Sequence, residues 1–234
     1  MSHALADCTT HRPVSLQTGL SGVSSAHVCR RHCRARTARE RILSAAYDLY
    51  STRGIRDVGV DEVIEQAGVA KATLYRHFSS KDELVIAFLD LREQRWVGDW
   101  VVAEATRRAD TAEGRLLAIF DLFDEWFHRD DFEGCPFINA LLEMGPDHPI
   151  GQASQQQLKA IRTILSDLAQ QANLRDPETF ARSWHILMKG SIVSAAEGDL
   201  DAARLARATA QLVLEHHAPQ LLADRVPTSR PARR

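Results

Sequence analysis

Two short amphipathic segments on either side of Gly68 carry the side chains best suited to contact DNA. Val63 points inward from the first segment, and Leu74 and Phe78 point inward from the second. Gly68 can adopt the positive φ at which one helix ends, so the pattern predicts a helix-turn-helix. A helix of this width enters the major groove of DNA. The second helix turns the following residues outward or sideways: Lys71, Ala72, Thr73, Tyr75, Arg76 and His77.

Basic residues that flank these segments are further candidates for contacts with phosphate groups. Arg34, Arg36, Arg39 and Arg41 form an arm before the first expected helix, and such arms enter the minor groove or bind phosphates. Lys81 begins a long helix, where an ammonium group and backbone N–H groups can hold an anion together. The alternative for each residue is a solvated surface side chain. From this set we expect Arg36, Arg39 and Lys81 to contact DNA.

Enzymatic and metal chemistry find little support in the sequence. We find no nucleophile elbow, P-loop, dinucleotide-binding glycine run or His-Glu-x-x-His motif. Cys29, His32 and Cys33 match no standard zinc-finger spacing. We therefore expect no catalytic residue, no metal and no cofactor.

Cys135 allows two interpretations. It precedes Pro136 at the start of an expected helix, where the helix dipole lowers a thiol pKa, and this favours a redox or electrophile sensor. Phe132, Phe137 and Ile138 argue instead for burial, which raises a thiol pKa. The remaining cysteines all lie near the amino terminus, so no resolving thiol is close in sequence. We expect a residue of the pocket or its gate rather than an obligatory redox switch.

Nearly all of the chain between its two ends has a helical pattern. Period-2 alternation is scarce and there is no Asn-Gly or Asp-Gly hairpin signal, so we predict an all-α fold. Residues 1–35 lack apolar periodicity and form an expected disordered basic tail, and residues 219–234 form an expected frayed tail. The expected helices span residues 37–53, 59–67, 71–78, 80–108, 111–129, 136–144, 152–173, 177–197 and 200–217.

Composition limits the class of protein. The chain has 234 residues, of which 44% are hydrophobic and 26% charged, as in soluble globular proteins. No apolar run reaches the length of a membrane helix, and the amino terminus lacks a signal-peptide core. Four cysteines are too few for a disulfide scaffold. We expect a cytoplasmic protein with no membrane partner. Basic residues outnumber acidic ones up to Lys81 and the reverse holds beyond it, which suggests one end that meets a polyanion.

The sequence around the turn resembles the TetR family of one-component transcriptional regulators. The similarity is carried by Gly-Val-Ala-Lys-Ala-Thr-Leu-Tyr-Arg-His-Phe at 68–78 and by Ser-Ser-Lys-Asp-Glu-Leu at 79–84. The spacing of the apolar residues before Gly54 is also similar to the family's first helix. The resemblance covers about residues 38–90. It implies a helix-turn-helix DNA-binding domain at 36–82 and a larger helical effector-binding and dimerisation domain at 83–218.

Three positions depart from the family pattern. Gly59 and Ala70 stand where the family usually has Ser or Thr before a helix, so neither residue can cap with a side chain. Asp61 is an acid near the surface expected to face phosphate groups. These residues bear on affinity for DNA rather than on the fold.

The resemblance also implies a small-molecule effector and a homodimer. Aromatic and thioether side chains in the middle helices suit a pocket for an apolar molecule, although most must be ordinary core. The expected ligand-binding residues are Trp100, Phe120, Phe123, Trp126, Cys135, Asn139, Trp184, His185 and Met188. Family members pair their last two helices across a two-fold axis. The expected dimer-interface residues are Trp184, Met188, Ser191, Ile192, Ala195, Leu205 and Leu212.

The hypothesis from the sequence is a dimeric regulator that binds a palindromic DNA operator. We expect a repressor that a small, largely apolar molecule releases from DNA. One alternative is an all-α enzyme, and another is an adaptor that kept the fold but lost its affinity for DNA. Binding to the upstream DNA of its own gene separates the adaptor from the regulator.

Overall fold

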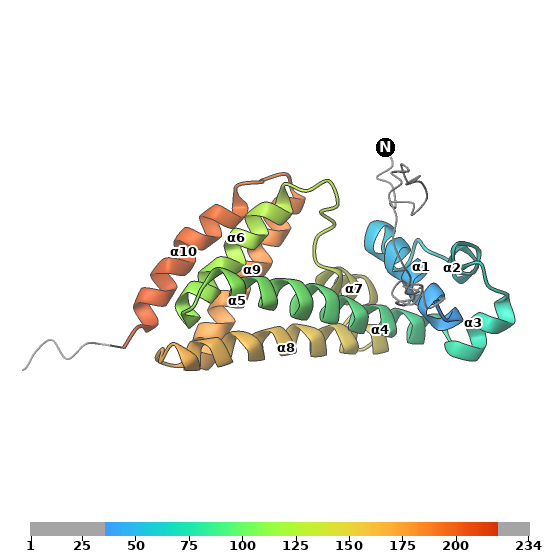
Figure 1. Ribbon diagram of the computed structural model, residues 1–234, viewed down its shortest axis with the longest axis horizontal. Helices are drawn as coiled ribbons and strands as arrows, with labels where there is room; N and C mark the ends of the chain where they lie inside the picture. Colours follow the sequence, from blue (N-terminus) through green and yellow to red (C-terminus); the bar gives the residue numbers. More distant parts are fainter. Residues whose placement is uncertain (1–35, 220–234) are drawn as a thin grey trace, which may run out of the picture. The chain divides into compact units, whose positions relative to one another are not determined.

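The computed structural model describes residues 36–219, and within them every regular element is a helix (Figure 1). The expected tails at 1–35 and beyond residue 219 lie outside this range. The all-α prediction is confirmed for the described residues. The elements are α1 (Ala38–Arg53), α2 (Val60–Ala67), α3 (Lys71–His77), α4 (Lys81–Arg92), the π-helix η1 (Glu93–Val102), α5 (Ala103–Arg108), α6 (Ala112–Phe127), α7 (Pro136–Met144), α8 (Pro149–Gln171), α9 (Pro177–Ala196) and α10 (Ala202–His217).

Helix α1 begins and ends where its capping residues predict. The Thr37 hydroxyl accepts a hydrogen bond from the Glu40 amide, and the Glu40 carboxylate accepts one from the Thr37 amide at 2.7 Å, which completes a capping box. Gly54, at φ +82°, ends the helix. Ile42 and Ala46 are fully buried and hold α1 against its neighbours.

The turn between α2 and α3 has the geometry that the sequence indicates. Gly68 adopts φ +61°, a left-handed conformation that glycine takes at little cost. Val63 and Leu74 are fully buried between the helices, so the two short elements share the core of α1. The expected absence of a side-chain cap at Gly59 and Ala70 is confirmed, although Glu62 accepts a hydrogen bond from the Gly59 amide at 3.0 Å.

A long helical segment leaves the helix-turn-helix and continues into the larger helical part. The prediction of an uninterrupted helix to Arg108 is confirmed in extent, because α4, η1 and α5 follow each other without a break. The ten central residues, Glu93–Val102, form a π-helix instead of an α-helix. The sequence carries no signal for this difference, since Trp96, Val97, Trp100 and Val101 recur with a spacing that also suits an α-helix.

The larger part is built on apolar faces of α6, α8, α9 and α10. Helix α9 packs against α6, α8 and α10, and α10 packs against α6 as well. At the centre, Trp184 stacks on Phe180 with ring centroids 5.0 Å apart and lies 5.4 Å from the ring of Phe120. All three side chains are essentially inaccessible to solvent. Helix α8 also contacts α4, which places the two helices side by side (Figure 1).

The turn from α7 to α8 depends on a close approach of two backbone segments. A Cβ atom on Gly151 would lie 1.8 Å from the carbonyl oxygen of Gly145, so only glycine is accommodated there. Helix α8 begins at Pro149, three residues earlier than the sequence suggested, because proline suits the first turn of a helix.

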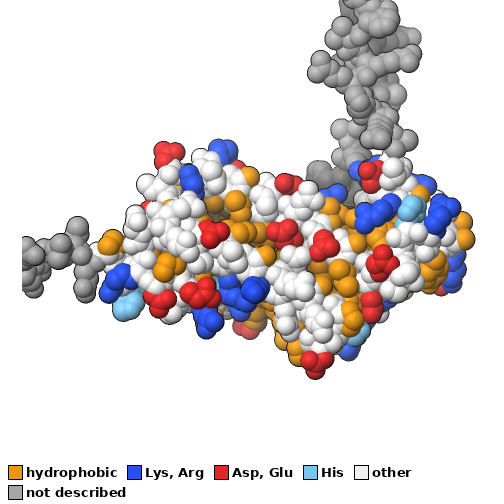
Figure 2. All heavy atoms as spheres, turned by 90° about the horizontal axis from the view of Figure 1, so that it is seen from below, with side chains coloured by type: hydrophobic (Ala, Val, Ile, Leu, Met, Phe, Trp, Pro, Cys, Tyr) orange, Lys and Arg blue, Asp and Glu red, His pale blue; other side chains and the backbone are white. Residues whose placement is uncertain are grey.

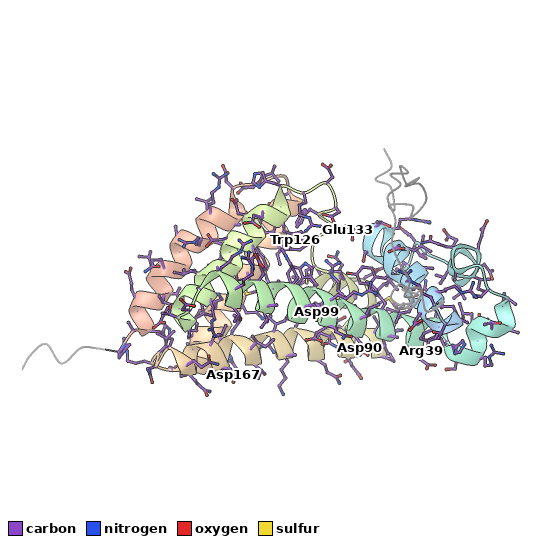
Figure 3. The ribbon with its side chains drawn as sticks, viewed as in Figure 1. Arg39, Asp90, Asp99, Trp126, Glu133 and Asp167 are labelled. Carbon is purple, nitrogen blue, oxygen red and sulfur yellow. The ribbon has the colours of Figure 1, made fainter. Side chains whose placement is uncertain are left out.

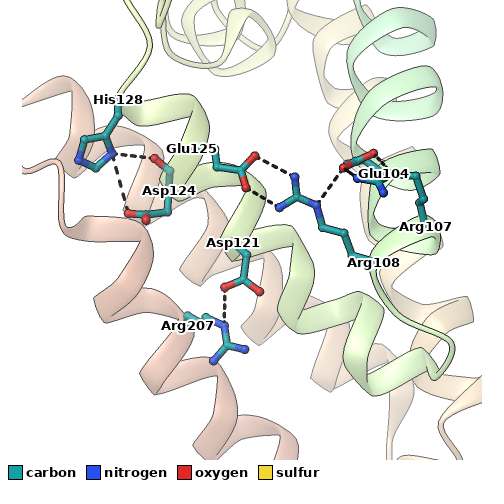
Figure 4. A network of polar contacts seen from close by, with 8 residues as sticks. All are labelled: Glu104, Arg107, Arg108, Asp121, Asp124, Glu125, His128 and Arg207. Atoms are coloured by element: carbon teal, nitrogen blue, oxygen red, sulfur yellow. Dashed lines mark hydrogen bonds and ion pairs between the residues drawn. The ribbon is translucent and has the colours of Figure 1, made fainter.

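Ion pairs join α5, α6 and α10 on the outside of this core (Figure 4). Arg108 forms two hydrogen bonds with the Glu125 carboxylate, at 2.7 and 2.8 Å, and a third with Glu104 at 3.0 Å. Arg207 of α10 pairs with Asp121 of α6 at 2.7 Å. The pKa of Glu104 is lowered to about 2, mainly by its hydrogen bonds from Arg107 and Arg108.

Candidate nucleic-acid interface and effector cavities

One face of α3 presents side chains that can reach DNA. Leu74 anchors the helix in the core, whereas Lys71, Ala72 and Arg76 are exposed and Tyr75 is 44% exposed. Thr73 and His77 are half-buried at the edges of this face. Figure 2 shows blue and pale-blue side chains gathered at the end of the molecule that carries the helix-turn-helix. The structure therefore places four of the six α3 residues expected from the sequence on the exposed face of the helix, and Thr73 and His77 at the edges of that face.

The charge on Lys71 is partly engaged within the protein. Its ammonium donates to the Asp61 carboxylate at 3.1 Å, and both side chains are largely exposed. The hydrogen bond from Lys71 to Asp61 raises the pKa of Lys71 above its ordinary value. A phosphate group must compete with Asp61 for this lysine. The sequence marked Asp61 as unfavourable for DNA but did not identify its partner.

Lys81 has a partner that the sequence did not predict. Its ammonium donates to the backbone carbonyl of Ile55 at 2.6 Å and is partly buried. This contact fixes the start of α4 to the loop between α1 and α2. Any contact between Lys81 and phosphate must use its two remaining N–H groups.

Arg36 and Arg39, the two arm residues expected to contact DNA, lie on the surface at the start of α1. The guanidinium of Arg39 lies 5.1 Å from the centre of the Phe78 ring, and Arg36 donates to the Ser44 hydroxyl at 3.5 Å. Arg41, by contrast, donates to the carbonyls of Ala67 and Gly68 at the end of α2. Arg41 therefore stabilises the turn of the helix-turn-helix, while Arg36 and Arg39 remain accessible.

An apolar cavity of about 250 Å³ lies within the larger helical part. Its walls come from η1, α5, α6, α8 and α9, and they include Val101, Ile119, Ile161 and Leu165. Arg115 and Asp167 supply polar groups at its margin. Such a lining suits a small, largely apolar molecule with a few polar substituents. Because η1 continues α4, a molecule in this cavity touches the helix that leads back to the helix-turn-helix.

The structure separates the nine expected ligand-binding residues. Only Met188 lines the apolar cavity, whereas Trp100 and Trp126 line a second, more polar cavity next to α1. Asn139 lines a third cavity between α1 and α7. The structure does not bring the nine residues together around one cavity, because aromatic residues of α6 and α9 mostly pack on each other. The remaining five residues line none of these three cavities: Phe120, Phe123, Cys135, Trp184 and His185.

The apolar stripe of α8 was the signal that the sequence interpretation missed. Leu158, Ile161, Leu165 and Leu168 recur at helical spacing, and three of these four residues line the apolar cavity. The sequence interpretation favoured aromatic residues, and the principal lining is aliphatic instead.

Burial changes the pKa values of two side chains in the larger helical part. Burial raises the pKa of the Cys135 thiol, and two backbone hydrogen bonds at the start of α7 only partly oppose this effect. Burial also lowers the pKa of His185 from 6.5 to about 3, with smaller contributions from Lys189 and Arg162. Both groups are therefore neutral near pH 7, and a low-pKa thiol at Cys135 is not supported.

Five of the seven expected dimer-interface residues are buried within one copy of the chain. Trp184, Met188, Ser191, Ile192 and Ala195 are each at most 5% exposed, so they pack inside one copy of the chain and offer no surface to another. The sequence interpretation chose the inner face of α9.

The outer face of α9 and the neighbouring face of α10 are apolar and exposed. Ile186 and Val193 are 64% and 47% exposed, and Leu205 and Leu212 are 62% and 65% exposed. The last two residues belong to the expected interface set. The helices that carry these residues, α9 and α10, pack against each other.

Three polar links connect the helix-turn-helix and α4 with α7 and α8. The Glu143 carboxylate accepts hydrogen bonds from the amides of Arg56, at 2.6 Å, and Ile55, at 3.4 Å. Gln157 of α8 donates to Asp90 of α4 at 2.8 Å, and Asp90 is labelled in Figure 3. His148 lies 3.6 Å from Asp82 in the first turn of α4. A change in the larger part can reach the helix-turn-helix through these contacts.

No helix of the described residues is long and apolar enough to span a membrane. The same residues contain no group of three His, Cys, Asp or Glu side chains that is placed to bind a metal ion.

Known proteins share both the helix-turn-helix and the larger helical part. A family model described as "Bacterial regulatory proteins, tetR family" matches residues 42–88. The transcriptional regulator LmrA of Bacillus subtilis is 32% identical over 139 residues, which cover 57% of this chain and 72% of LmrA. The transcriptional activator FasR of Mycolicibacterium smegmatis is 38% identical over 94 residues, which cover 39% of this chain and 41% of FasR. The crystal structure of SCO4454, a TetR-family transcriptional regulator from Streptomyces coelicolor, superposes with a TM-score of 0.69 at 28% identity and covers 78% of this chain and 96% of that one.

The fold and the exposed α3 face define a helix-turn-helix transcriptional regulator that binds DNA. The chain belongs to the TetR family of such regulators. Members of this family bind DNA, function as dimers and respond to small-molecule effectors, and they are not enzymes.

Proposed function

We propose that this protein is a cytoplasmic, homodimeric repressor that binds a palindromic operator and leaves it when a small, largely apolar molecule occupies the cavity beside η1. The apolar cavity carries the proposal, because its wall is part of the same continuous helix that begins at the helix-turn-helix. Residues 36–82 are proposed to bind DNA, and residues 83–218 to bind the effector and the second copy.

The proposed contacts with DNA use the outer face of α3 and the basic residues beside it. Tyr75 and Thr73 offer hydroxyl groups to bases or phosphates, and Lys71 offers an ammonium once Asp61 releases it. The complete proposed set is Arg36, Arg39, Lys71, Ala72, Thr73, Tyr75, Arg76, His77 and Lys81.

The proposed dimer pairs the outer faces of α9 and α10. Exposed apolar stripes on neighbouring helices favour burial against a second copy. A dimer places two copies of α3 in successive major grooves only when they are about 34–36 Å apart.

The effector is proposed to act by changing the distance between the two α3 helices of the dimer. A ligand shifts an equilibrium only by its different affinity for the two conformations, so it must fill the cavity better in the conformation that does not bind DNA. Displacement of η1 by a ligand moves α4 and, through Lys81 and Glu143, the elements of the helix-turn-helix.

Binding to the upstream DNA of its own gene tests the proposed function. We expect a complex of one dimer per palindrome, with log affinity falling against log salt by about 0.9 for each phosphate neutralised. Binding of a single copy, or a salt slope near zero, contradicts the proposal. Failure to bind the DNA at all supports an adaptor that has lost DNA affinity. A promoter fusion then distinguishes repression from the activation named for FasR.

A further inference from the structure

A second cavity lies between the helix-turn-helix and the larger helical part. It has a volume of about 330 Å³ and is more polar than the cavity beside α8. Its walls come from α1, the end of α4, η1, the end of α6 and the loop after α6. Figure 3 labels two of its residues, Trp126 near the end of α6 and Glu133 on the following loop. The linings of the polar and apolar cavities share only Trp96.

Arg92 lines this polar cavity as a buried cation that forms no salt bridge within residues 36–219. Its residue is only 8% exposed, and its guanidinium lies 5.7 Å from the centres of both the Tyr47 and Trp96 rings. One of its nitrogens donates to the Tyr47 hydroxyl at 2.8 Å. Its Nε has no hydrogen-bond partner, and among residues 36–219 no carboxylate lies within ion-pair distance of Arg92. A buried charge of this kind is costly unless an acceptor meets it.

The acidic residues of the cavity do not supply that acceptor. Asp131 is held by two hydrogen bonds from Arg129, at 2.6 and 2.7 Å. Burial raises the pKa of Glu133, although the charge of Arg92 opposes the shift. Asp48 is exposed. The cavity also contains a second unpartnered group, the buried Oγ of Ser51.

The remaining wall is aromatic. Trp100 and Trp126 line the cavity beside Trp96, and the rings of Trp96 and Trp126 lie 4.8 Å apart. Aromatic faces of this kind favour a planar apolar body, which packs against them in an offset or edge-on manner.

We propose that this cavity is a second ligand site that binds an aromatic carboxylate. The carboxylate accepts hydrogen bonds from Arg92 and from the Ser51 hydroxyl, and the aromatic ring packs on Trp100 and Trp126. The occupied site joins α1 to the α6–α7 loop, because its walls belong to both. This proposal does not depend on DNA binding or on the apolar effector cavity.

Three small molecules with the same ring test which group Arg92 recognises. Phenylacetate, phenylacetamide and 2-phenylethylamine are titrated into the full-length protein at equal ionic strength, and tryptophan fluorescence and thermal stability are recorded. We expect phenylacetate to bind at least about tenfold more tightly than the amide or the amine, as for a hydrogen-bonded charge pair. Equal binding of the three molecules, or no binding of any of them, overturns the proposal. This comparison needs no variant.

Matched arginine variants show which of the two cavities binds the acid. Arg92→Gln should remove the preference for the acid, whereas Arg92→Lys should weaken binding but keep the preference. Arg95→Gln is the control, because Arg95 is exposed and lies 5.2 Å from the Tyr47 ring but does not line the cavity. Arg115→Gln tests the apolar cavity instead. Loss of the preference in Arg115→Gln and not in Arg92→Gln would place the acid in the apolar cavity and overturn the proposal.

Discussion

At the scale of single residues, the pair between Asp61 and Lys71 sets how readily α3 meets a phosphate. The two side chains are exposed, so the pair contributes little to stability, but it engages the lysine that we propose to contact DNA. If α3 binds DNA as proposed, Asp61 therefore lowers the affinity of this protein for its operator.

Asp61→Asn should raise the affinity for operator DNA by about threefold, since an exposed pair of this kind is weak. The measurement is fluorescence anisotropy of labelled operator at fixed salt. Glu65→Gln is the matched control, because it removes one exposed negative charge from the same helix without breaking an ion pair among the described residues. An equal gain in both variants would show a general charge effect and would contradict the specific role of the pair.

His185 should make the folded state sensitive to acid. Its folded pKa of about 3 lies below the ordinary 6.5, so the unfolded chain takes up a proton first as pH falls, and stability is lost below pH 6.5. Between pH 7.5 and pH 5 this loss is about 2 kcal/mol, because pH 5 lies about 1.5 units below the unfolded pKa of 6.5 but above the folded pKa of about 3. His185→Leu should remove it in chemical denaturation measured at both pH values. The exposed His216→Gln is the control, and an unchanged pH slope in His185→Leu would refute the assignment.

At the scale of elements, the proposed dimer depends on the outer faces of α9 and α10. Ile186→Asp or Leu212→Asp should convert the dimer into a folded monomer, because each places a carboxylate in an apolar contact without disturbing the core. Sedimentation with circular dichroism measures both properties. Leu142→Asp is the control, since Leu142 is 79% exposed on α7. A dimer that survives the first two changes, or dissociates with the third, would place the interface elsewhere.

Helix boundaries were predictable from the sequence because capping and turn residues act locally. Thr37, Gly54 and Gly68 mark their helix ends through contacts and φ values that depend on a few neighbouring residues. The face that a helix presents to solvent was less predictable. Helix α9 has apolar residues on both sides, and only its packing against α6, α8 and α10 determines that Ser191 is inside and Ile186 outside.

The candidate sites were also predictable to different degrees, because some depend on one helix and others on the packing of several elements. The α3 face follows from one short helix whose inward residues are clear. The cavities depend on five or more elements, so the aliphatic wall of α8, the buried Arg92 and the π-helical turn of η1 have no local signature. Ser191, for example, belongs to the dimer interface expected from the sequence, but Ser191→Asp would place a charge in the core of one copy.

At the scale of the whole molecule, one continuous helical segment relates two cavities to the DNA-binding face. Trp96 on η1 forms part of the wall of both cavities, and α4 begins at Lys81, which is bonded to the helix-turn-helix. Glu143 gives a second connection through the amides that follow α1. The two proposed ligands, one apolar and one anionic, would therefore both contact η1 through Trp96.

The central claim is that α3 of a dimer binds the operator, and Tyr75→Ala tests it most directly. Tyr75 is 44% exposed on the outer face, so its removal should leave the circular dichroism spectrum and the dimer unchanged. We expect affinity for the upstream DNA, measured by fluorescence anisotropy, to fall at least about tenfold, because each dimer loses two contacts. Leu142→Ala, on the exposed face of α7, should bind as the unmodified protein does. If Tyr75→Ala also binds with unmodified affinity, α3 does not dock on DNA through this face and the account is wrong.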